Sequence, residues 1–136
     1  MADTLKFEIV TPEGTVVSDQ VQMVTLPTVE GQMGVLPHHV RLMTQVVPGE
    51  VAVRTAGREA FFAIGGGLVE VAGDHVTVVT DMAVEVDRID EAKVEEARRR
   101  AEARLGDKMS EEEIAAVNAS LARSLAQLHV KRRHRA

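Results

Sequence analysis

The chain has 136 residues, of which 45% are hydrophobic and 27% charged, so it can form one complete hydrophobic core and a small appendage. It has no cysteine, which excludes disulfide scaffolds, thiol nucleophiles and cysteine-ligated zinc. A net charge of −5 and only three aromatic residues argue against nucleic-acid binding, and no apolar run approaches the ~20 residues of a membrane helix. Neither a nucleic-acid partner nor direct membrane insertion is therefore expected.

The distribution of Gly and Pro divides the chain near residue 87. Residues 1–86 hold nine of the ten Gly and all four Pro and carry a net charge of −7, whereas residues 87–136 hold one Gly and carry +2. Gly and Pro between valine-rich runs indicate short strands, and their replacement by Ala, Glu and Arg indicates helix. We therefore predict a β domain over residues 1–86 and a helical domain over residues 87–136.

The β domain is predicted to contain about ten strands at hairpin spacing. Apolar and charged residues alternate over Leu5–Ile9, as in a strand with one buried face. No helix of useful length fits between the expected breaks. These are Pro27, Gly31, Pro37, Pro48–Gly49, Ala56–Gly57, Gly65–Gly67 and Gly73–Asp74. The pattern predicts a ten-stranded β-sandwich rather than a parallel α/β sheet. The predicted strands are residues 5–9, 15–18, 21–26, 32–36, 42–47, 50–55, 58–64, 68–72, 75–80 and 83–86.

The helical domain is predicted to be an antiparallel two-helix hairpin. Asp87 or Asp90 caps the first helix, which ends near Leu105, with Gly106 at the C′ position. The capping box Ser110–Glu113 begins the second helix. Helices of this length are marginal alone, so the hairpin is expected to pack on the β domain or on a partner. An apolar face is predicted from Ile114, Val117, Leu121, Leu125 and Leu128, and residues 131–136 are predicted to form an exposed basic tail.

No catalytic or metal-binding constellation is recognisable in the sequence. His38 and His39 are adjacent, so on a strand they would point to opposite faces and could not easily chelate one metal ion. Gly65–Gly67 lacks the Lys-Ser/Thr pair of a phosphate-binding loop and is expected to mark a bulge or a close approach of two backbones. These features favour a binding or coupling component over an enzyme.

Four segments in this order resemble the epsilon subunit of F-type ATP synthases. They are Glu30–His39, Pro48–Val51, Ile64–Val71 and Ile89–Ala92, and the first resembles the family pattern E-G-x-x-G-x-L/Y-P-x-H. The resemblance runs from about residue 5 to residue 130. It implies a ten-stranded β-sandwich followed by two antiparallel helices.

The resemblance implies a non-catalytic subunit in the central stalk of a proton-translocating rotary ATP synthase, on the cytoplasmic face of a bacterial inner membrane. Its partners would be the gamma subunit, the c-subunit ring and, through the hairpin, the catalytic alpha and beta subunits. Gln32 would face the c-ring and His39 would approach gamma, with Glu30 and His38 as neighbouring contact residues. In many bacteria the family's hairpin extends along gamma and blocks ATP hydrolysis, so inhibition is an expectation here.

Some family members bind ATP at the hairpin through a motif I/L-D-x-x-R-A and arginines on both helices. Here the motif reads Ile89–Val94, with Lys93 in place of Arg, and Lys lacks the planar fork of a guanidinium. Gln127 stands where a further family arginine is often found. No cofactor is therefore predicted. The residues that the resemblance assigns to a nucleotide are Ile89, Asp90, Lys93, Arg100 and Arg123.

Two alternatives from other function classes remain open. A stand-alone ATP-sensing regulatory protein would use the helical hairpin and would bind ATP without partners. A small enzyme or sugar-binding β-sandwich would need a polar cluster on the sheet, and none can be recognised in the sequence.

Overall fold

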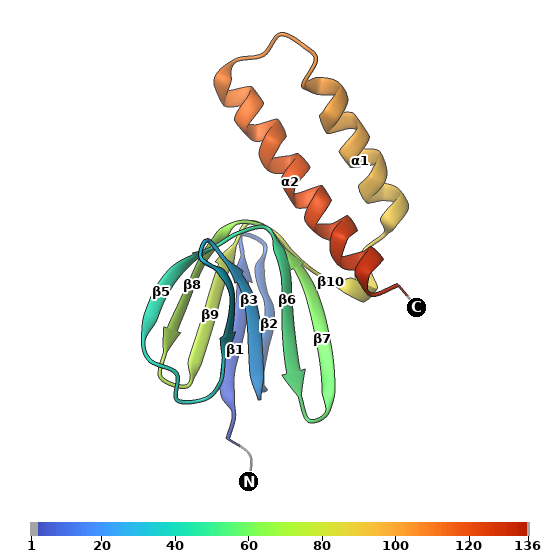
Figure 1. The fold of residues 1–136 in the computed structure, drawn as a ribbon. Helices are drawn as coiled ribbons and strands as arrows, with labels where there is room; N and C mark the ends of the chain where they lie inside the picture. The colour runs from blue at the N-terminus through green and yellow to red at the C-terminus, as the bar shows by residue number, and fades with distance from the viewer. Residues whose placement is uncertain (1–2, 136) are drawn as a thin grey trace.

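The computed structural model describes residues 3–135 of the chain, which form a β domain and a helical hairpin that projects from one end of it (Figure 1). Within these residues there are ten strands, a short 3₁₀ helix and two α-helices. This architecture confirms the predicted β-sandwich followed by a two-helix hairpin. The strands are β1 (Leu5–Thr11), β2 (Gly14–Val21), β3 (Met23–Thr28), β4 (Gly31–Val35), β5 (Leu42–Val46), β6 (Gly49–Thr55), β7 (Arg58–Ile64), β8 (Gly67–Ala72), β9 (His75–Thr80) and β10 (Ala83–Glu85). The helices are η1 (Val86–Arg88), α1 (Glu91–Arg104) and α2 (Glu111–Arg133).

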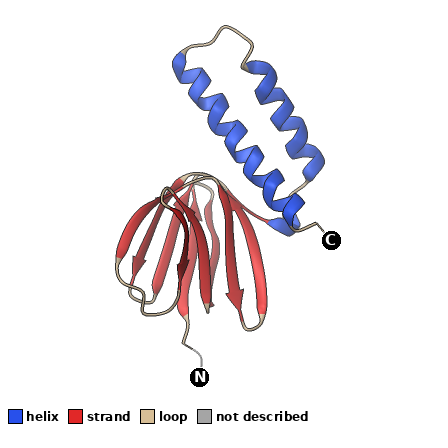
Figure 2. Ribbon diagram, viewed as in Figure 1, coloured by secondary structure: helices blue, strands red, loops and turns tan. Residues whose placement is uncertain are grey.

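The strands form one continuous sheet that folds into two facing layers (Figure 2). Its order is β10-β7-β6-β3-β5-β8-β9-β1-β2, with β4 paired to β3. Among the described strands, β1 and β9 pair in parallel and the other pairs are antiparallel. The layers bring β2 against β6, which encloses the core.

The core follows directly from the alternation of side chains along the strands. In β1 the predicted alternation is confirmed, because Leu5, Phe7 and Ile9 are at most 1% exposed while Lys6 and Glu8 are partly exposed. A strand places successive side chains on opposite faces, so every second residue enters the core. Most of the remaining core positions are valines, which suit the crowded interior of a sheet.

The predicted break at Pro27 is wrong, because Pro27 lies within β3 opposite Gln32 of β4. The missing N–H is tolerated there, and the Pro27 carbonyl accepts a hydrogen bond from the backbone N–H of Val47 at 3.0 Å. The chain turns instead after Thr28, whose hydroxyl donates to the Gly31 carbonyl at 2.6 Å. Gly31 has a φ of 110°, a conformation that glycine adopts without steric cost.

The ends of the helices follow the predicted capping residues. Asp90 is the N-cap of α1 and accepts a hydrogen bond from the Lys93 backbone N–H at 3.2 Å. Ser110 and Glu113 form the predicted capping box of α2, with bonds of 3.1 and 3.3 Å. Gly106 follows the C-cap Leu105 as predicted, but its φ lies outside the left-handed region, and the turn is closed by 3₁₀-type bonds instead.

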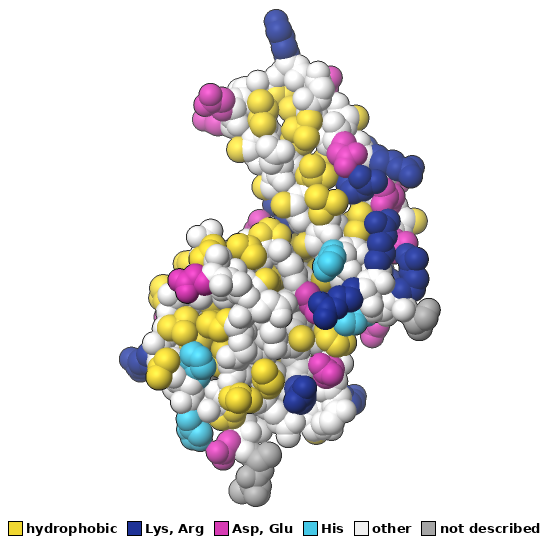
Figure 3. Space-filling view, in the orientation of Figure 1, with side chains coloured by type: hydrophobic (Ala, Val, Ile, Leu, Met, Phe, Trp, Pro, Cys, Tyr) yellow, Lys and Arg dark blue, Asp and Glu magenta, His cyan; other side chains and the backbone are white. Residues whose placement is uncertain are grey.

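The helical hairpin buries less of its predicted apolar face than the spacing indicates. Val117 and Leu128 are buried, but Ile114 is 39% and Leu125 is 47% exposed. The reason is that α1 and the β domain together cover one side of α2 and leave the rest to solvent. In Figure 3, hydrophobic side chains are visible on the hairpin and basic side chains gather along its right-hand edge.

The predicted basic tail is also different in the structure. Lys131, Arg132 and Arg133 form the last turn of α2, and only the end of the chain follows it, with Ala136 outside the described residues. Arg132 pairs with Glu95 of α1, where the N–O distance is 2.9 Å, and Arg135 pairs with Glu91. Lysine and arginine in a last turn are favourable because they face the negative end of the helix dipole.

Candidate functional site

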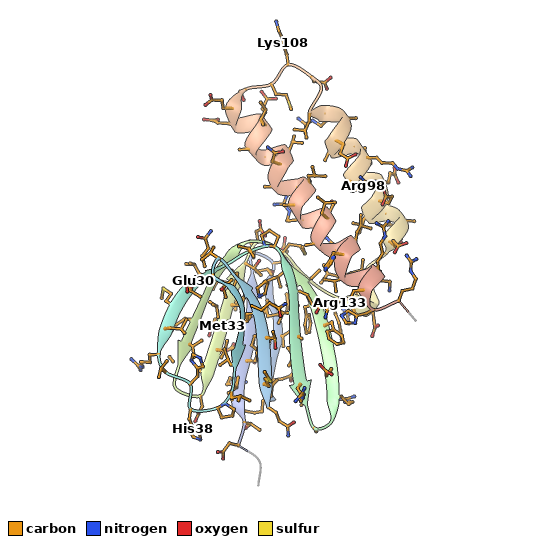
Figure 4. The ribbon with its side chains drawn as sticks, viewed as in Figure 1. Glu30, Met33, His38, Arg98, Lys108 and Arg133 are labelled. Carbon is orange, nitrogen blue, oxygen red and sulfur yellow. The ribbon has the colours of Figure 1, made fainter. Side chains whose placement is uncertain are left out.

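The predicted c-ring and gamma contact residues lie in two separate places. Glu30 is exposed in the turn between β3 and β4, and Gln32 is exposed in β4. His38 and His39 follow β4, and Figure 4 shows Glu30 and His38 at opposite ends of the β domain. The structure therefore does not gather the four residues into one surface.

His38 is held in an unusual backbone conformation by two carboxylates. Its φ is 68°, its backbone N–H donates to Asp74 Oδ1 at 2.8 Å, and its ring Nε2 lies 3.0 Å from Asp3 Oδ2. The hydrogen bond to Asp3, and then the charges of Asp74 and Asp3, raise the pKa of His38 above its ordinary value of 6.5. A non-glycine residue with positive φ persists only where its surroundings hold it, so this loop is a defined structure.

An apolar surface, which we define as the partly exposed Val10 and the exposed Met43, Leu68 and Val79, lies on the outer face of β1, β5, β8 and β9. Val10 is opposite Val79, and Val79 is opposite Leu68, so the three form one row across the sheet. Leu68 is 52%, Val79 53% and Met43 63% exposed. Met43 is opposite Glu70 on the neighbouring strand pair, so it lies diagonal to Leu68 at the side of this row. Exposed apolar side chains that gather on one face of a sheet are typical of a protein–protein contact.

The sequence prediction missed the apolar surface, although a signal for it was present. Leu68-Val69 and Val78-Val79 are pairs of adjacent apolar residues within single strands. Because neighbours on a strand point to opposite faces, one member of each pair must point away from the core. Val69 and Val78 are the buried members, so Leu68 and Val79 face outward.

The candidate nucleotide residues are distributed along the hairpin rather than collected. Ile89 is buried against Ala63 and Val130, and the Asp90 carboxylate caps α1. Arg100 lines a groove between α1 and α2 whose wall includes Ala97, Ala101 and Val117. Lys93 is exposed on α1. Arg123 of α2 is partly exposed and pairs with Asp81 of the β domain, with an N–O distance of 3.1 Å.

The Gly65–Gly67 segment is a close approach of two chain segments, as predicted. A Cβ at Gly67 would lie 1.9 Å from the Val79 carbonyl oxygen, and one at Gly65 would lie 1.9 Å from Asp81 Oδ1. Glycine at position 65 therefore leaves room for the carboxylate that pairs with Arg123. The segment thus contacts β9 at Gly67 and, at Gly65, the aspartate that pairs with α2.

The base of the hairpin carries a network of ion pairs between its two helices. Glu95 of α1 pairs with Arg98 on its own helix and with Arg132 on α2. The hydrogen bond from Arg98, together with Arg132, lowers the pKa of Glu95 from its ordinary value of 4.5, in spite of partial desolvation. The network ties α1 to the last turn of α2 close to the β domain.

The structure offers no preformed metal centre within residues 3–135, where no three His, Asp or Glu side chains come together. None of the described helices combines the length and apolar character needed to cross a membrane.

Two family models match adjacent parts of the chain. The ATP synthase delta/epsilon chain β-sandwich domain matches residues 4–86, and the delta/epsilon chain long α-helix domain matches residues 87–132. Among curated relatives, the ATP synthase epsilon chain of Herpetosiphon aurantiacus is 40% identical over 131 residues, with 96% of each chain covered. The epsilon chain of Halorhodospira halophila is 42% identical over 127 residues, covering 92% of this chain and 90% of its own.

Two solved structures have a similar fold. A chain in the OSCP/F1/c-ring structure of the Euglena gracilis mitochondrial ATP synthase matches with a TM-score of 0.74 and 25% identity, over 93% of this chain and 79% of that one. A chain from the central stalk/c-ring structure of the Tetrahymena thermophila enzyme matches with a TM-score of 0.64 and 13% identity, over 95% and 97%, which supports the fold alone. The family models and the curated relatives confirm the resemblance to epsilon subunits, and the chain belongs to the ATP synthase delta/epsilon family.

Proposed function

We propose that this chain is the central-stalk epsilon subunit of a proton-translocating F-type ATP synthase and couples rotation of the c-ring and gamma to ATP synthesis. Family membership over nearly the whole chain supports the proposal. The observation that carries it is the exposed apolar surface on the β domain, because a coupling subunit must be held firmly by its partner. The subunit contributes no catalytic group of its own to the reaction.

In this proposal the two parts of the chain have different partners. The β domain, residues 1–86, docks on gamma and on the c-ring, and the hairpin, residues 87–136, contacts the catalytic alpha and beta subunits. The apolar surface and His39 would face gamma, while Glu30 and Gln32 would meet polar loops of the c-ring. The separation of Glu30 from His38 across the β domain is compatible with contacts to two different subunits (Figure 4).

The gamma contact is tested by placing a charge in the apolar surface. Leu68→Glu should weaken binding of the full chain to purified gamma at least tenfold, because burying an unpaired carboxylate costs several kcal/mol. Leu105→Glu is the matched control, since Leu105 is 38% exposed at the C-cap of α1 and belongs to the hairpin, not to the apolar surface of the β domain. Titration calorimetry measures both affinities, and equal losses for the two variants would exclude the apolar surface as the gamma contact.

We also propose that the hairpin inhibits ATP hydrolysis by the assembled enzyme. The proposal is supported by the exposed Ile114 and Leu125, which leave apolar area on α2 for another protein. A chain ending at Asp87 should assemble with the other subunits and give faster ATP hydrolysis than the full chain. An unchanged rate, with normal incorporation of the shortened chain, would contradict inhibition but not central-stalk membership.

We propose that the chain lies at the cytoplasmic face of a bacterial inner membrane and is held there by its partners, and its family membership supports this location. The expected result is recovery of the chain with membranes that contain the ATP synthase and its release together with the catalytic subunits. Recovery in the soluble fraction while alpha and beta stay on the membrane would contradict the assignment.

The alternative, a stand-alone ATP sensor, has less structural support. Asp90 already caps α1, and Arg123 is paired with Asp81 in the β domain. These contacts already engage two of the residues that a nucleotide would need. Saturable ATP binding by the isolated chain would favour this second function.

A further inference from the structure

The hairpin is attached to the β domain through the C-terminal end of α2. The contacts come mainly from α2, which packs against β6, β7 and η1, while Lys108 at the tip of the hairpin points away from the β domain (Figure 4). Arg133, by contrast, lies at the junction in the same view. A small number of side chains at this junction therefore carries most of the attachment.

Glu50 of β6 is the buried carboxylate of this junction. Its side chain is only 7% exposed, and its two oxygens have different partners. Oε2 lies 3.2 Å from Arg133 Nη1, and Oε1 lies 2.5 Å from His134 Nε2. Among the described residues, the partners of Glu50 thus come from the last residue of α2 and from its C-cap.

Apolar contacts complete the junction around this carboxylate. The His134 ring stacks on Phe61 of β7, with ring centroids 3.7 Å apart and planes inclined by 18°. Val130 is fully buried against Ala63 and Ile89. Lys131 Nζ donates to the Val86 carbonyl at 3.2 Å, which ties the same turn of α2 to η1.

We propose that Glu50 is the latch that holds the hairpin on the β domain and sets how often the hairpin detaches. A carboxylate removed from water needs compensating charge and hydrogen bonds, and here the hairpin supplies both. When the hairpin leaves, Glu50 returns to water and loses its partners together. The consequence for ATP hydrolysis rests on the proposed inhibitory function, but the latch itself does not.

The latch is tested by measuring the position of the hairpin in the full chain. Because the chain has no native cysteine, Arg41→Cys and Lys108→Cys introduce two exposed labelling sites, one on the β domain and one at the hairpin tip. Pulsed electron–electron double resonance measures the distribution of distances between spin labels at these two sites, and the long-distance or shifted population gives the fraction of molecules with a displaced hairpin. Glu50→Gln should raise that fraction about tenfold, since a hydrogen-bonded charge is exchanged for a neutral amide.

Glu59→Gln is the matched control. Glu59 lies on the neighbouring strand β7, is exposed, and has no ion-pair partner within the described residues. It should leave the distance distribution unchanged. His134→Ala is a second test that spares the β domain, because His134 lies beyond α2, and it should move the distribution in the same direction as Glu50→Gln.

The outcomes separate the latch from the proposed function. Unchanged distributions in both Glu50→Gln and His134→Ala, with an intact β-sheet spectrum, would overturn the latch. Displacement of the hairpin in Glu50→Gln without a change in the ATP hydrolysis of the assembled enzyme would retain the latch and contradict inhibition. Displacement with slower ATP hydrolysis would support both, whereas displacement with faster hydrolysis would retain the latch and contradict inhibition.

Discussion

Gly65, which follows β7, and Gly67, which begins β8, should respond very differently to the same added methyl group. In Gly65→Ala the new Cβ meets the Asp81 side chain, with Oδ1 at 1.9 Å and Cγ at 3.0 Å. In Gly67→Ala it meets main-chain atoms, with the Val79 carbonyl oxygen at 1.9 Å and Thr80 Cα at 2.9 Å. A side chain can rotate away, whereas main chain within a paired strand cannot move alone.

The expected costs follow from what each clash displaces. For Gly65→Ala, the Asp81–Arg123 ion pair is lost, and because its side chains are 48% and 34% exposed it contributes only about 0.2–1 kcal/mol. For Gly67→Ala, the end of the β8–β9 ladder must shift, which costs ~3 kcal/mol in strained packing and lost hydrogen bonds. The second substitution should therefore destabilise the chain several-fold more than the first.

Urea denaturation followed by far-ultraviolet circular dichroism measures both, since the chain has no Trp or Tyr for fluorescence. A double-mutant cycle with Asp81→Ala isolates the contact, because Gly65→Ala should cost about 0.2–1 kcal/mol less once the carboxylate is gone. Equal costs for the two glycine substitutions would refute the reasoning. So would a cost of Gly65→Ala that does not depend on Asp81.

Three further predictions concern charge, capping and ligand binding. Asp3→Asn should lower the pKa of His38, measured by NMR titration. Because folding raises this pKa, the stabilisation from protonated His38 is complete below pH 6.5 and is lost as the pH rises through the pKa of the folded state. An unchanged His38 titration in the variant would contradict the contact with Asp3. Ser110→Ala should destabilise the hairpin by ~1 kcal/mol through loss of the N-cap, seen as faster amide exchange in the first turn of α2, with Ser120→Ala as the control. Titration calorimetry of the full chain with ATP should show no saturable binding, because Arg123 is already paired with Asp81. Strong ATP binding that Arg123→Ala abolishes would contradict this prediction.

Local signals in the sequence were sufficient for most of the elements. The alternation in Leu5–Ile9 and the capping residues Asp90 and Ser110 act over two to four positions, so they can be recognised without the rest of the chain. Pro27 was the exception, because its place in β3 depends on Val47, which is far away in sequence. A proline, which usually ends a strand, can lie within one where a segment distant in sequence fits its backbone geometry.

The contact residues were only partly accessible to sequence reasoning. Glu30, Gln32, His38 and His39 were found through the family resemblance, but nothing in their close spacing indicates that Glu30 and His38 lie at opposite ends of the β domain (Figure 4). Their assignment to the c-ring and gamma stays a prediction. The exposed face of α2 was likewise beyond helical periodicity, because α1 and the β domain decide which apolar side chains are covered.

The fold class, the helix caps and the family could all be recognised from the sequence, since they depend on local patterns or on the order of motifs. Tertiary structure alone decided the apolar surface, because both faces of β8 and β9 carry apolar residues and strand pairing selects which face is buried. It also decided the junction at Glu50 and His134, which are 84 residues apart and meet only because α2 ends against β6 and β7. Contacts between distant segments depend on how the elements pack, and no local pattern carries that information.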